Sequence, residues 1–189
     1  MVVKYFYQEE TSSITGYSDS NWAGCKKTAK STSGGAIAKG QHFLKSWSTT
    51  QKSITLSSGE AELVAAVKMC TELIGISQLA KDWGEEVKGT VWVDSNAAIG
   101  VACRKGNGKL RHVKVGTLWI QEKVEDGEVN IRKVAGEENP ADMMTKNLNE
   151  GKVEKFMKML NKEFKDGRAE ASLKLKTLRK ASGRLSPGR

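Results

Sequence analysis

The first 56 residues alternate between apolar and polar positions in short runs, which is the pattern of extended strands. The runs are separated by polar segments, and Gly40 suits a hairpin connection between the second and the third. The three predicted strands lie within residues 13–24 (SITGYSDSNWAG), 34–41 (GGAIAKGQ) and 42–56 (HFLKSWSTTQKSITL). The simplest account of this part is an antiparallel meander.

Between Ser57 and about Trp83 the apolar spacing changes to that of an amphipathic helix. Apolar residues now recur three and four positions apart, at Leu63, Ala66, Val67, Cys70, Leu73 and Ile74. Ser57 or Ser58 can cap the start of this helix, and Gly84 suits its end. One long helix is therefore predicted after the three strands.

Downstream of Gly84, short β patterns alternate with helical ones. The predicted elements are a strand over 89–95, a helix over 96–104, a helix through Lys123 after a loop at 105–111, a strand over 129–136 and a last core helix over 140–148. Pro140 opens that last segment, where the first turn of a helix tolerates proline. A meander followed by alternating strands and helices predicts an α/β fold with a mixed five-stranded sheet flanked by helices.

The formal net charge of +9 is unevenly distributed. Residues 149–189 contain 12 Lys and Arg against 5 Asp and Glu, whereas residues 1–148 are nearly balanced. We expect a domain over 1–148, with its core from about residue 13, and a basic, partly helical and partly disordered tail over 149–189. Such a tail suits a polyanionic partner, and a solvated charged helix is the alternative interpretation.

The three cysteines are odd in number, far apart and in no CxxC pair. This usage is typical of reduced thiols in an intracellular protein rather than of a disulfide framework or a zinc site. The N-terminal residues lack the apolar region of a signal peptide, and no apolar run approaches the roughly 18 residues of a membrane span. We therefore expect a protein that is not secreted and has no membrane partner.

Four acidic residues occupy positions that suggest chemistry. Asp19 lies in the first long strand, Glu62 in the first turns of the long helix, Asp94 at the end of a strand and Asp142 in the last core helix. Aspartate is depleted in strands, and a buried charge has to be paired or bind a cation. Carboxylates from separate elements suit Mg²⁺, although Asp94 as a helix cap and Asp142 near a helix dipole are ordinary alternatives.

Two glutamates, Glu60 and Glu62, lie close together at the start of the long helix, and helix geometry separates them. Residues two apart on a helix do not share a face. At about 100° per residue, Glu62 projects at the margin of the apolar stripe, whereas Glu60 lines up with Thr71 and Gln78 on the solvent side. We predict that Glu62, not Glu60, joins the other carboxylates.

Several short sequence motifs resemble those of a known family: GYSDSNWAG, KSTSGG, SWSTTQKSITLSSGEAEL, VDSNAAI, EKVEDGEV and NPADMMTKNL. From about Ser13 to Leu148 the chain resembles the ribonuclease H domain of copia-type retrotransposon polyproteins. The resemblance implies a ribonuclease H-like fold that hydrolyses the RNA strand of RNA–DNA hybrids with two Mg²⁺ ions, for which Mn²⁺ can substitute. It also implies that the metal ligands are Asp19, Glu62, Asp94 and Asp142.

The same resemblance suggests further roles. His112 would assist water positioning or product release, and Ser57, Ser58 and Asn96 would contact the sugars and phosphates of the hybrid. The alternatives are an incidental surface histidine and helix capping. The implied partner within the parent polyprotein is its reverse transcriptase domain, with a monomer in isolation, in the cytoplasm, a virus-like particle or the nucleus.

Two departures from the family pattern affect substrate contacts rather than the carboxylates: Cys25 replaces an acid, and Val-Lys-Val follows His112. Three other interpretations stay open. The first is a catalytically silent nucleic-acid-binding domain, and the second is an integrase or transposase. In the third, the basic tail is the functional part and tethers nucleic acid. Integrases and transposases have a late glutamate as third acid and none on the first helix, so Glu62 and Asp142 favour ribonuclease H.

Overall fold

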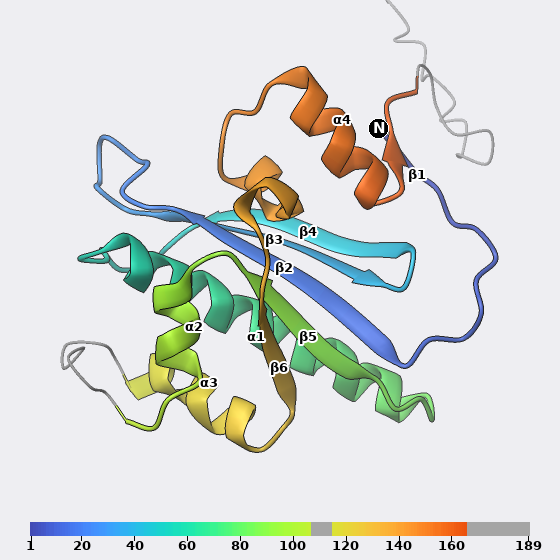
Figure 1. Ribbon diagram of the computed structural model, residues 1–189, viewed down its shortest axis with the longest axis horizontal. Coiled ribbons are helices and arrows are strands. Elements are labelled where there is room, and N and C mark those ends of the chain that lie inside the picture. The colour runs from blue at the N-terminus through green and yellow to red at the C-terminus, as the bar shows by residue number, and fades with distance from the viewer. Residues whose placement is uncertain (107–114, 166–189) are drawn as a thin grey trace, which may run out of the picture.

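A computed structural model of the chain describes residues 1–106 and 115–165. At its centre is a mixed five-stranded sheet with the order β4-β3-β2-β5-β6 (Figure 1). The strands are β2 (Ser13–Asn21), β3 (Thr32–Lys39), β4 (His42–Thr50), β5 (Lys88–Val93) and β6 (Val129–Lys133). Strand β3 is antiparallel to β2 and β4, whereas β5 is parallel to β2 and β6. The predicted α/β fold and its mixed sheet are confirmed.

One face of the sheet is covered by α1 (Ser58–Asp82), α2 (Asn96–Ala102) and α3 (Val115–Glu125). The main core lies between them, where strand residues such as Ile37 and Val91 meet Leu63, Met69 and Leu73 of α1. These three leucine and methionine side chains are fully buried and lie on the apolar stripe that the sequence predicts. Burial of this stripe is the main force that holds α1 on the sheet.

Both ends of α1 agree with the predicted signals. Ser57 is the N-cap, and its hydroxyl accepts a hydrogen bond from the Glu60 backbone N–H at 3.2 Å. Gly84 follows the helix with a φ of +84°, a backbone conformation that glycine adopts without strain. By length and mean hydropathy alone α1 is suited to cross a membrane, but its packing on the sheet is that of a core helix.

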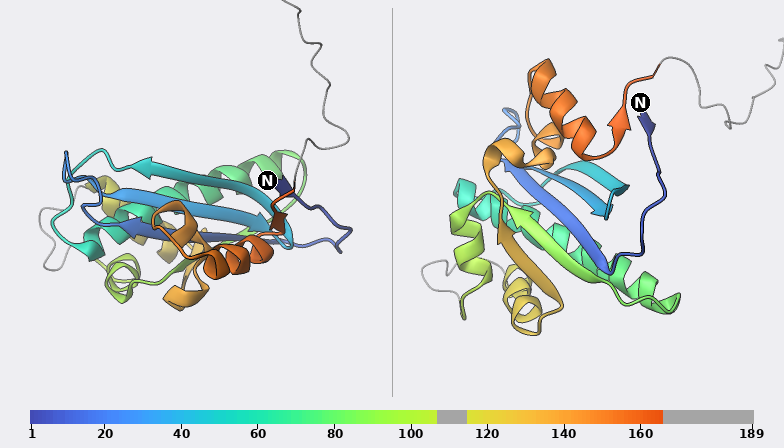
Figure 2. Two further views of the ribbon diagram at one scale, coloured as in Figure 1. Left: turned by 90° about the horizontal axis from the view of Figure 1, so that it is seen from above. Right: turned by 45° about the vertical axis from the view of Figure 1, so that its right-hand side comes forward.

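The opposite face, over the β2–β4 side, carries the late part of the chain: the short helices η1 (Gly136–Glu138) and η2 (Pro140–Met144) and then α4 (Glu150–Met159), as Figure 2 shows. A core helix over 140–148 was expected, and this prediction is wrong: η2 is a single short 3₁₀ segment. The backbone N–H groups of Thr145 and Lys146 both donate to the Asp142 carbonyl, at 3.1 and 2.9 Å. The helix therefore ends on this carbonyl and does not continue through the segment.

Packing continues beyond Leu148, into the segment that was expected to be a tail. Phe156 of α4 is fully buried, and Leu160 packs with Ala36 and Phe43 on the sheet. Residues Lys162–Glu163 form β7, which pairs antiparallel with β1 (Val2–Val3). No strand was predicted at β1. Residues 166–189 lie outside the described part of the chain.

Gly34 allows η2 to approach the sheet closely. It lies in β3 directly opposite Asp19 of β2. A Cβ atom at position 34 would lie 2.6 Å from Cγ2 of Thr145, 2.8 Å from Cβ of Met144 and 3.0 Å from the Ala141 carbonyl oxygen. Two of these atoms are backbone or next to it and cannot rotate away, so the close contact requires glycine.

We therefore expect Gly34→Ala to lower the free energy of unfolding by about 1–3 kcal/mol, the usual cost of overpacking. Chemical denaturation checks this. The matched control is Gly75→Ala in α1, where an added Cβ meets nothing within 4 Å. This substitution should raise the free energy of unfolding by about 0.5–1 kcal/mol, because alanine favours a helix interior over glycine. Equal effects of the two substitutions would show that η2 is not closely packed at Gly34.

Candidate metal centre

Three carboxylates meet at one end of the sheet. Each of Asp19, Glu62 and Asp94 offers an oxygen atom, and these oxygens all lie within 4.8 Å of one another. Asp19 is fully buried, Glu62 is 8% exposed and Asp94 is half-buried. The sequence predicted this gathering from three elements that are far apart along the chain.

Strand register brings Asp19 and Asp94 together. Strands β2 and β5 are parallel, and their register ends at the pair Ser18 and Val93. Asp19 directly follows Ser18, and Asp94 directly follows Val93. Both carboxylates therefore lie at the same end of the sheet. Asp94 is not the cap of α2, because Ser95 caps this helix by accepting from the Ala98 N–H at 3.2 Å. The capping alternative for Asp94 is thereby removed.

Glu62 reaches the same edge from the start of α1. Its Oε1 accepts hydrogen bonds from the Ser20 backbone N–H at 3.1 Å and from the Ser20 hydroxyl at 2.9 Å. Its Oε2 is buried, and no group in the described part of the chain forms a hydrogen bond with it. A buried carboxylate oxygen without a partner is costly unless it carries a proton or binds a cation.

The neighbouring Glu60 has a different task. Its Oε2 accepts a hydrogen bond from the Leu56 backbone N–H at 2.8 Å, while its own N–H donates to Ser57. This reciprocal arrangement resembles a capping box at the start of α1. Glu62 thus joins the other carboxylates, whereas Glu60 bonds to the backbone at the N-terminal end of α1. The two side chains lie on different sides of the helix, as the sequence predicts.

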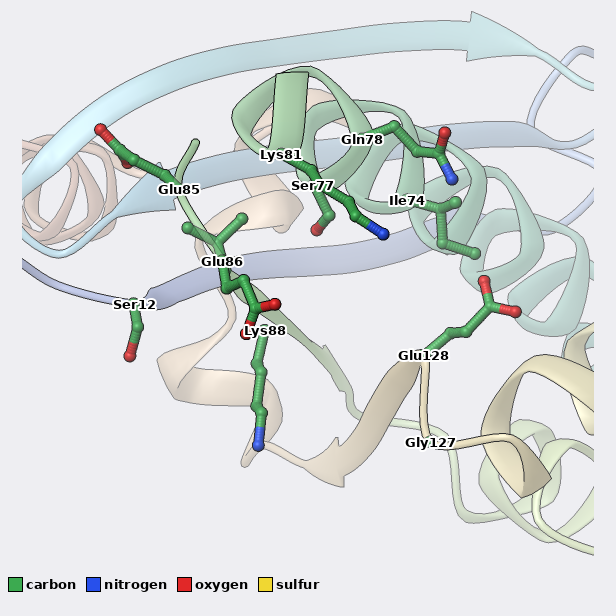
Figure 3. Close-up of a pocket in the computed structure, with 11 residues that line it drawn as sticks. Ser12, Ile74, Ser77, Gln78, Lys81, Glu85, Glu86, Lys88, Gly127 and Glu128 are labelled. Carbon is green, nitrogen blue, oxygen red and sulfur yellow. The ribbon is translucent and has the colours of Figure 1, made fainter. Parts of the chain in front are cut away.

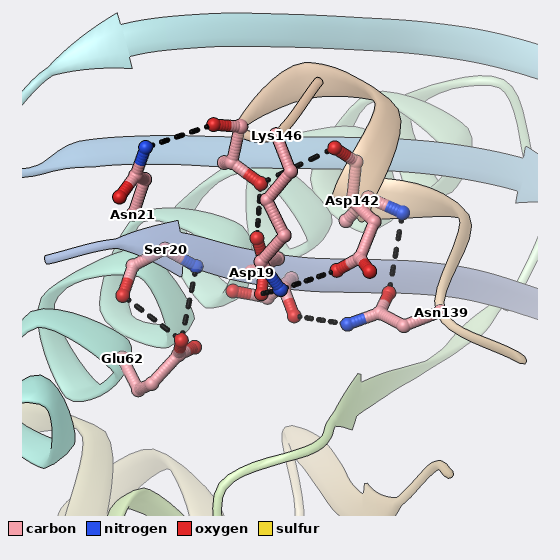
Figure 4. A network of polar contacts seen from close by, with 10 residues as sticks. Asp19, Ser20, Asn21, Glu62, Asn139, Asp142 and Lys146 are labelled. Carbon is pink, nitrogen blue, oxygen red and sulfur yellow. Dashed lines mark hydrogen bonds and ion pairs between the residues drawn. The ribbon is translucent and has the colours of Figure 1, made fainter. Parts of the chain in front are cut away.

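The fourth predicted acid, Asp142, lies on the other side of Asp19. It does not belong to the group of three, and Lys146 connects it to Asp19 (Figure 4). The Lys146 ammonium lies 3.0 Å from Oδ1 of Asp19 and 2.8 Å from Oδ1 of Asp142. The Thr145 hydroxyl donates a hydrogen bond to Oδ2 of Asp19. Both oxygens of the buried Asp19 therefore have partners on the segment after η2.

Asn139 fastens η2 to the strand that carries Asp19. This side chain is fully buried, and its amide donates to the Ser18 carbonyl at 2.9 Å. Its Oδ1 accepts from the Ala141 N–H at 3.2 Å and so caps η2. Asn139 thus fixes the position of Asp142 relative to Asp19, although the sequence analysis included it only as the first residue of the NPADMMTKNL motif and gave it no role. The available signal was its place as a cap residue directly before Pro140.

Thr145 and Lys146 were also missed. Their signal in the sequence is their spacing of three and four residues after Asp142, which brings side chains onto one side of a helical turn. The sequence analysis considered only acids, serines, an asparagine and a histidine near the site. A lysine that neutralises two carboxylates was therefore not considered.

Burial and mutual repulsion raise the pKa of two carboxyl groups when no cation is bound. Burial, together with the negative charges of Asp19 and Asp94, raises the pKa of Glu62 to about 8, although the hydrogen bonds from Ser20 oppose this. Burial raises the pKa of Asp19 to about 6, although Thr145 and Lys146 oppose this. Burial lowers the pKa of Lys146, but its contacts with Asp142 and Asp19 outweigh this and raise it overall. A cation at the three carboxylates would compete with these protons.

The predicted substrate-contacting residues are found near this edge of the sheet. Ser57 and Ser58 are exposed at the start of α1, and Asn96 is exposed at the start of α2. The two helix starts adjoin, because a Cβ atom at Gly59 would lie 3.0 Å from that of Ala97. Ser57 has a capping role, as its alternative interpretation proposed. His112 lies outside the described residues.

The pocket drawn in Figure 3 lies away from the carboxylates. A pocket of about 600 Å³ lies at the opposite end of α1 and is lined by residues such as Ser77, Lys81 and Glu128 (Figure 3). None of the four acids borders it.

Comparisons with known proteins give a consistent picture. No protein-family model matches the chain. The Retrovirus-related Pol polyprotein from transposon TNT 1-94 of Nicotiana tabacum is 32% identical over 143 residues, which are 75% of this chain and 11% of that protein. The corresponding polyprotein from transposon RE1 of Arabidopsis thaliana is 27% identical over 149 residues, 77% of this chain and 10% of that protein. The chain thus spans about a tenth of these relatives.

The fold has a solved counterpart. LC11-RNase H1, isolated from compost, superposes with a TM-score of 0.56 at 19% identity. The match covers 71% of this chain and 93% of that protein. At this level of identity the likeness concerns the fold.

The raised pKa of Glu62 predicts how stability depends on pH. The pKa of this carboxyl is 4.5 in the unfolded chain and about 8 in the folded protein. At a pH between these two values, the group therefore takes up a proton on folding. This stabilisation is fully present below pH 4.5 and is lost as the pH rises through 8. In EDTA, the melting temperature should therefore fall between pH 5 and 9, and Glu62→Gln should flatten the decline, most clearly above pH 6.

The matched control is Glu60→Gln, which changes the same charge on the same helix turn and should keep the wild-type slope. Asp19, with a pKa raised from 3.8 to about 6, acts in the same direction, so some slope below pH 6 should persist in Glu62→Gln. An unchanged slope above pH 6 in Glu62→Gln would contradict the proton on Glu62.

Proposed function

We propose that this chain is the ribonuclease H domain of a copia-type retrotransposon Pol polyprotein and that it hydrolyses the RNA strand of RNA–DNA hybrids. Its similarity in sequence to retrotransposon Pol polyproteins and in fold to a ribonuclease H1 supports the proposal. The observation that carries the proposal is the meeting of Asp19, Glu62 and Asp94 at one end of the sheet. This set of ligands contains only oxygen atoms, from three separate elements. It suits phosphodiester hydrolysis assisted by a divalent cation.

The site fits a hard divalent cation. Mg²⁺ and Mn²⁺ prefer carboxylate oxygens, and Oε2 of Glu62 is a buried oxygen that lacks a partner within the described chain. Asp19, Glu62 and Asp94 would hold one ion, and Asp19 with Asp142 would hold the other. When bound, two such ions activate a water molecule and stabilise the leaving oxygen of the scissile phosphate.

The protein's own residues prepare this site. Ser20 holds one oxygen of Glu62 and leaves the other without a hydrogen bond among the described residues. Thr145 fixes the rotation of the Asp19 carboxylate, and Asn139 holds η2 against β2. These contacts keep the carboxylates in place before any ligand arrives, so that little has to be reorganised on binding.

The exposed polar residues beside the carboxylates would contact the substrate. Ser58 and Asn96 are free of the capping role that Ser57 has, and their side chains suit hydrogen bonds to 2′-hydroxyl groups and phosphates. The first backbone N–H groups of α1 add partial positive charge at the same place. His112 is proposed to assist water positioning or product release.

The wider context of the domain is also a proposal. The relatives are Pol polyproteins about ten times as long as the matched region, so a reverse transcriptase domain of the same polyprotein is the proposed partner in the chain. We propose that the isolated domain is a monomer that acts inside the cell, without a membrane. The basic residues after 165 would add affinity for nucleic acid through phosphate contacts.

A cleavage assay on a labelled RNA–DNA hybrid with Mg²⁺ or Mn²⁺ tests the function. Wild-type protein should cut the RNA and spare the DNA. Asp19→Asn, Asp94→Asn and Glu62→Gln should each lower the rate by about 100-fold or more, because even residues that only support metal ligands cost about 10–100-fold when removed. Glu60→Gln, the matched control, should keep most of the activity.

Activity in Glu62→Gln together with its loss in Glu60→Gln would overturn the assignment of the glutamate. If the wild-type protein binds hybrid but cuts neither strand, the domain is a catalytically silent binding module. Circular dichroism of each variant separates loss of chemistry from loss of the fold.

Removal of the metal should abolish cleavage. With excess EDTA the wild-type rate should fall to background, because the carboxylates alone cannot neutralise the charge that develops on the phosphate. Addition of Mg²⁺ beyond the EDTA should restore it. Undiminished cutting in EDTA would exclude the proposed mechanism.

A further inference from the structure

Lys146 provides a positive charge at the centre of the carboxylates. Its ammonium lies within 3.0 Å of one oxygen each of Asp19 and Asp142. Both partners are almost entirely buried, with side chains 0% and 8% exposed, whereas the Lys146 side chain is 41% exposed. The charge of this lysine therefore belongs to the site, although its stem lies at the surface.

The four acids define two places for a cation, and Asp19 is common to both. On one side Asp19 faces Glu62 and Asp94, and no basic side chain is bonded to these two carboxylates among the described residues. On the other side Asp19 faces Asp142, and there the Lys146 ammonium bridges the pair. The place between Asp19, Glu62 and Asp94 thus depends on a cation from solution. The place between Asp19 and Asp142 already holds the Lys146 ammonium.

An ammonium and a divalent ion cannot occupy the second place together. Both need the same oxygens of Asp19 and Asp142, and two cations within a few ångströms repel each other strongly where water is scarce. A second divalent ion must therefore displace the Lys146 side chain from at least one carboxylate.

Displacement of the lysine is sterically simple. Lys146 follows η2, its backbone N–H is held by the Asp142 carbonyl at 2.9 Å, and only its flexible side chain reaches the carboxylates. Because the stem is partly exposed, the ammonium can turn toward solvent without disturbing the core. A nucleic-acid phosphate at the site would offer the ammonium a new anionic partner.

We propose that the Lys146 ammonium fills the cation position between Asp19 and Asp142 until nucleic acid binds, so that the free domain takes up one divalent ion rather than two. This inference rests on the proposed function, because it concerns the same site. It makes Lys146 a positioning residue that couples loading of the second ion to binding of the substrate.

Mn²⁺ titration of the free protein tests the inference without any measurement of cleavage. Calorimetry should give one bound Mn²⁺ per wild-type chain. Lys146→Gln should bind two, or bind the second at least about 10-fold more tightly, and electron paramagnetic resonance should then show a spin-coupled pair. Lys146→Arg keeps the cation and should bind one. Lys105→Gln removes a lysine whose ion pair with Glu125 is exposed, and this matched control should also bind one.

A second measurement does not depend on a Lys146 variant that folds. Wild-type protein with a hybrid whose RNA strand is 2′-O-methylated, and so resists cleavage, should show the spin-coupled Mn²⁺ pair that is missing without the hybrid. Asp19→Asn with the same hybrid should not show it, which excludes ions held by the nucleic acid alone.

The outcomes separate the inference from the proposed function. Two ions in the free wild-type protein, or one ion in a folded Lys146→Gln, would each overturn the role of Lys146 and leave the proposed nuclease standing. No coupled pair with the hybrid would overturn both the role of Lys146 and the proposed two-ion mechanism. Failure of the wild-type protein to bind any Mn²⁺, with or without the hybrid, would remove the metal site and overturn both.

Discussion

The buried carboxylate of Asp19 is the constraint on which the rest of this structure depends. A charge that is fully removed from water is costly unless neighbouring groups offset it. Asp19 meets this requirement on one side through Thr145 and Lys146, while on the other side Glu62 and Asp94 add negative charge to the same site. The domain therefore combines a neutralised half and an acidic half around one residue, and the acidic half is the part that fits a divalent cation.

Features far from the chemistry serve this arrangement. The segment after Pro140 has to approach the sheet closely for Thr145 and Lys146 to reach Asp19, which explains why β3 has Gly34 at that point. Asn139 fastens this segment to the sheet, since its amide donates to the Ser18 carbonyl of β2. A short 3₁₀ turn achieves this with few residues, whereas a longer helix would carry its last turn away from the carboxylates.

The sequence was most informative where apolar residues recur at a regular spacing, or where the spacing determines which way a side chain projects from a helix. The α1 stripe predicted both the helix and the orientation of Glu62 away from Glu60, and alternation predicted the five strands of the sheet. Asp19, Glu62 and Asp94 could be found because an acid in a strand or at the margin of an apolar face is unusual. The short η2, the pairing of β1 with β7 and the roles of Asn139 and Lys146 could not, because each depends on contacts between segments more than a hundred residues apart. For Lys146 the spacing from Asp142 is the only local signal, and it does not indicate the contact with Asp19.

The pairing of β1 with β7 has a mechanical consequence. Val2 lies opposite Glu163 and Val3 opposite Lys162 (Figure 1), so the two ends of the described domain leave the fold side by side. A pulling force applied through the flanking chain would act on this short ribbon from one end and open its hydrogen bonds one after another, rather than shearing them all at once. The ribbon would peel apart at low force, and α4 would next bear the load through Phe156 and Leu160, which are buried against the sheet. On the N-terminal side, residues 4–12 lead directly into β2, so the same force would then act on the strand that carries Asp19.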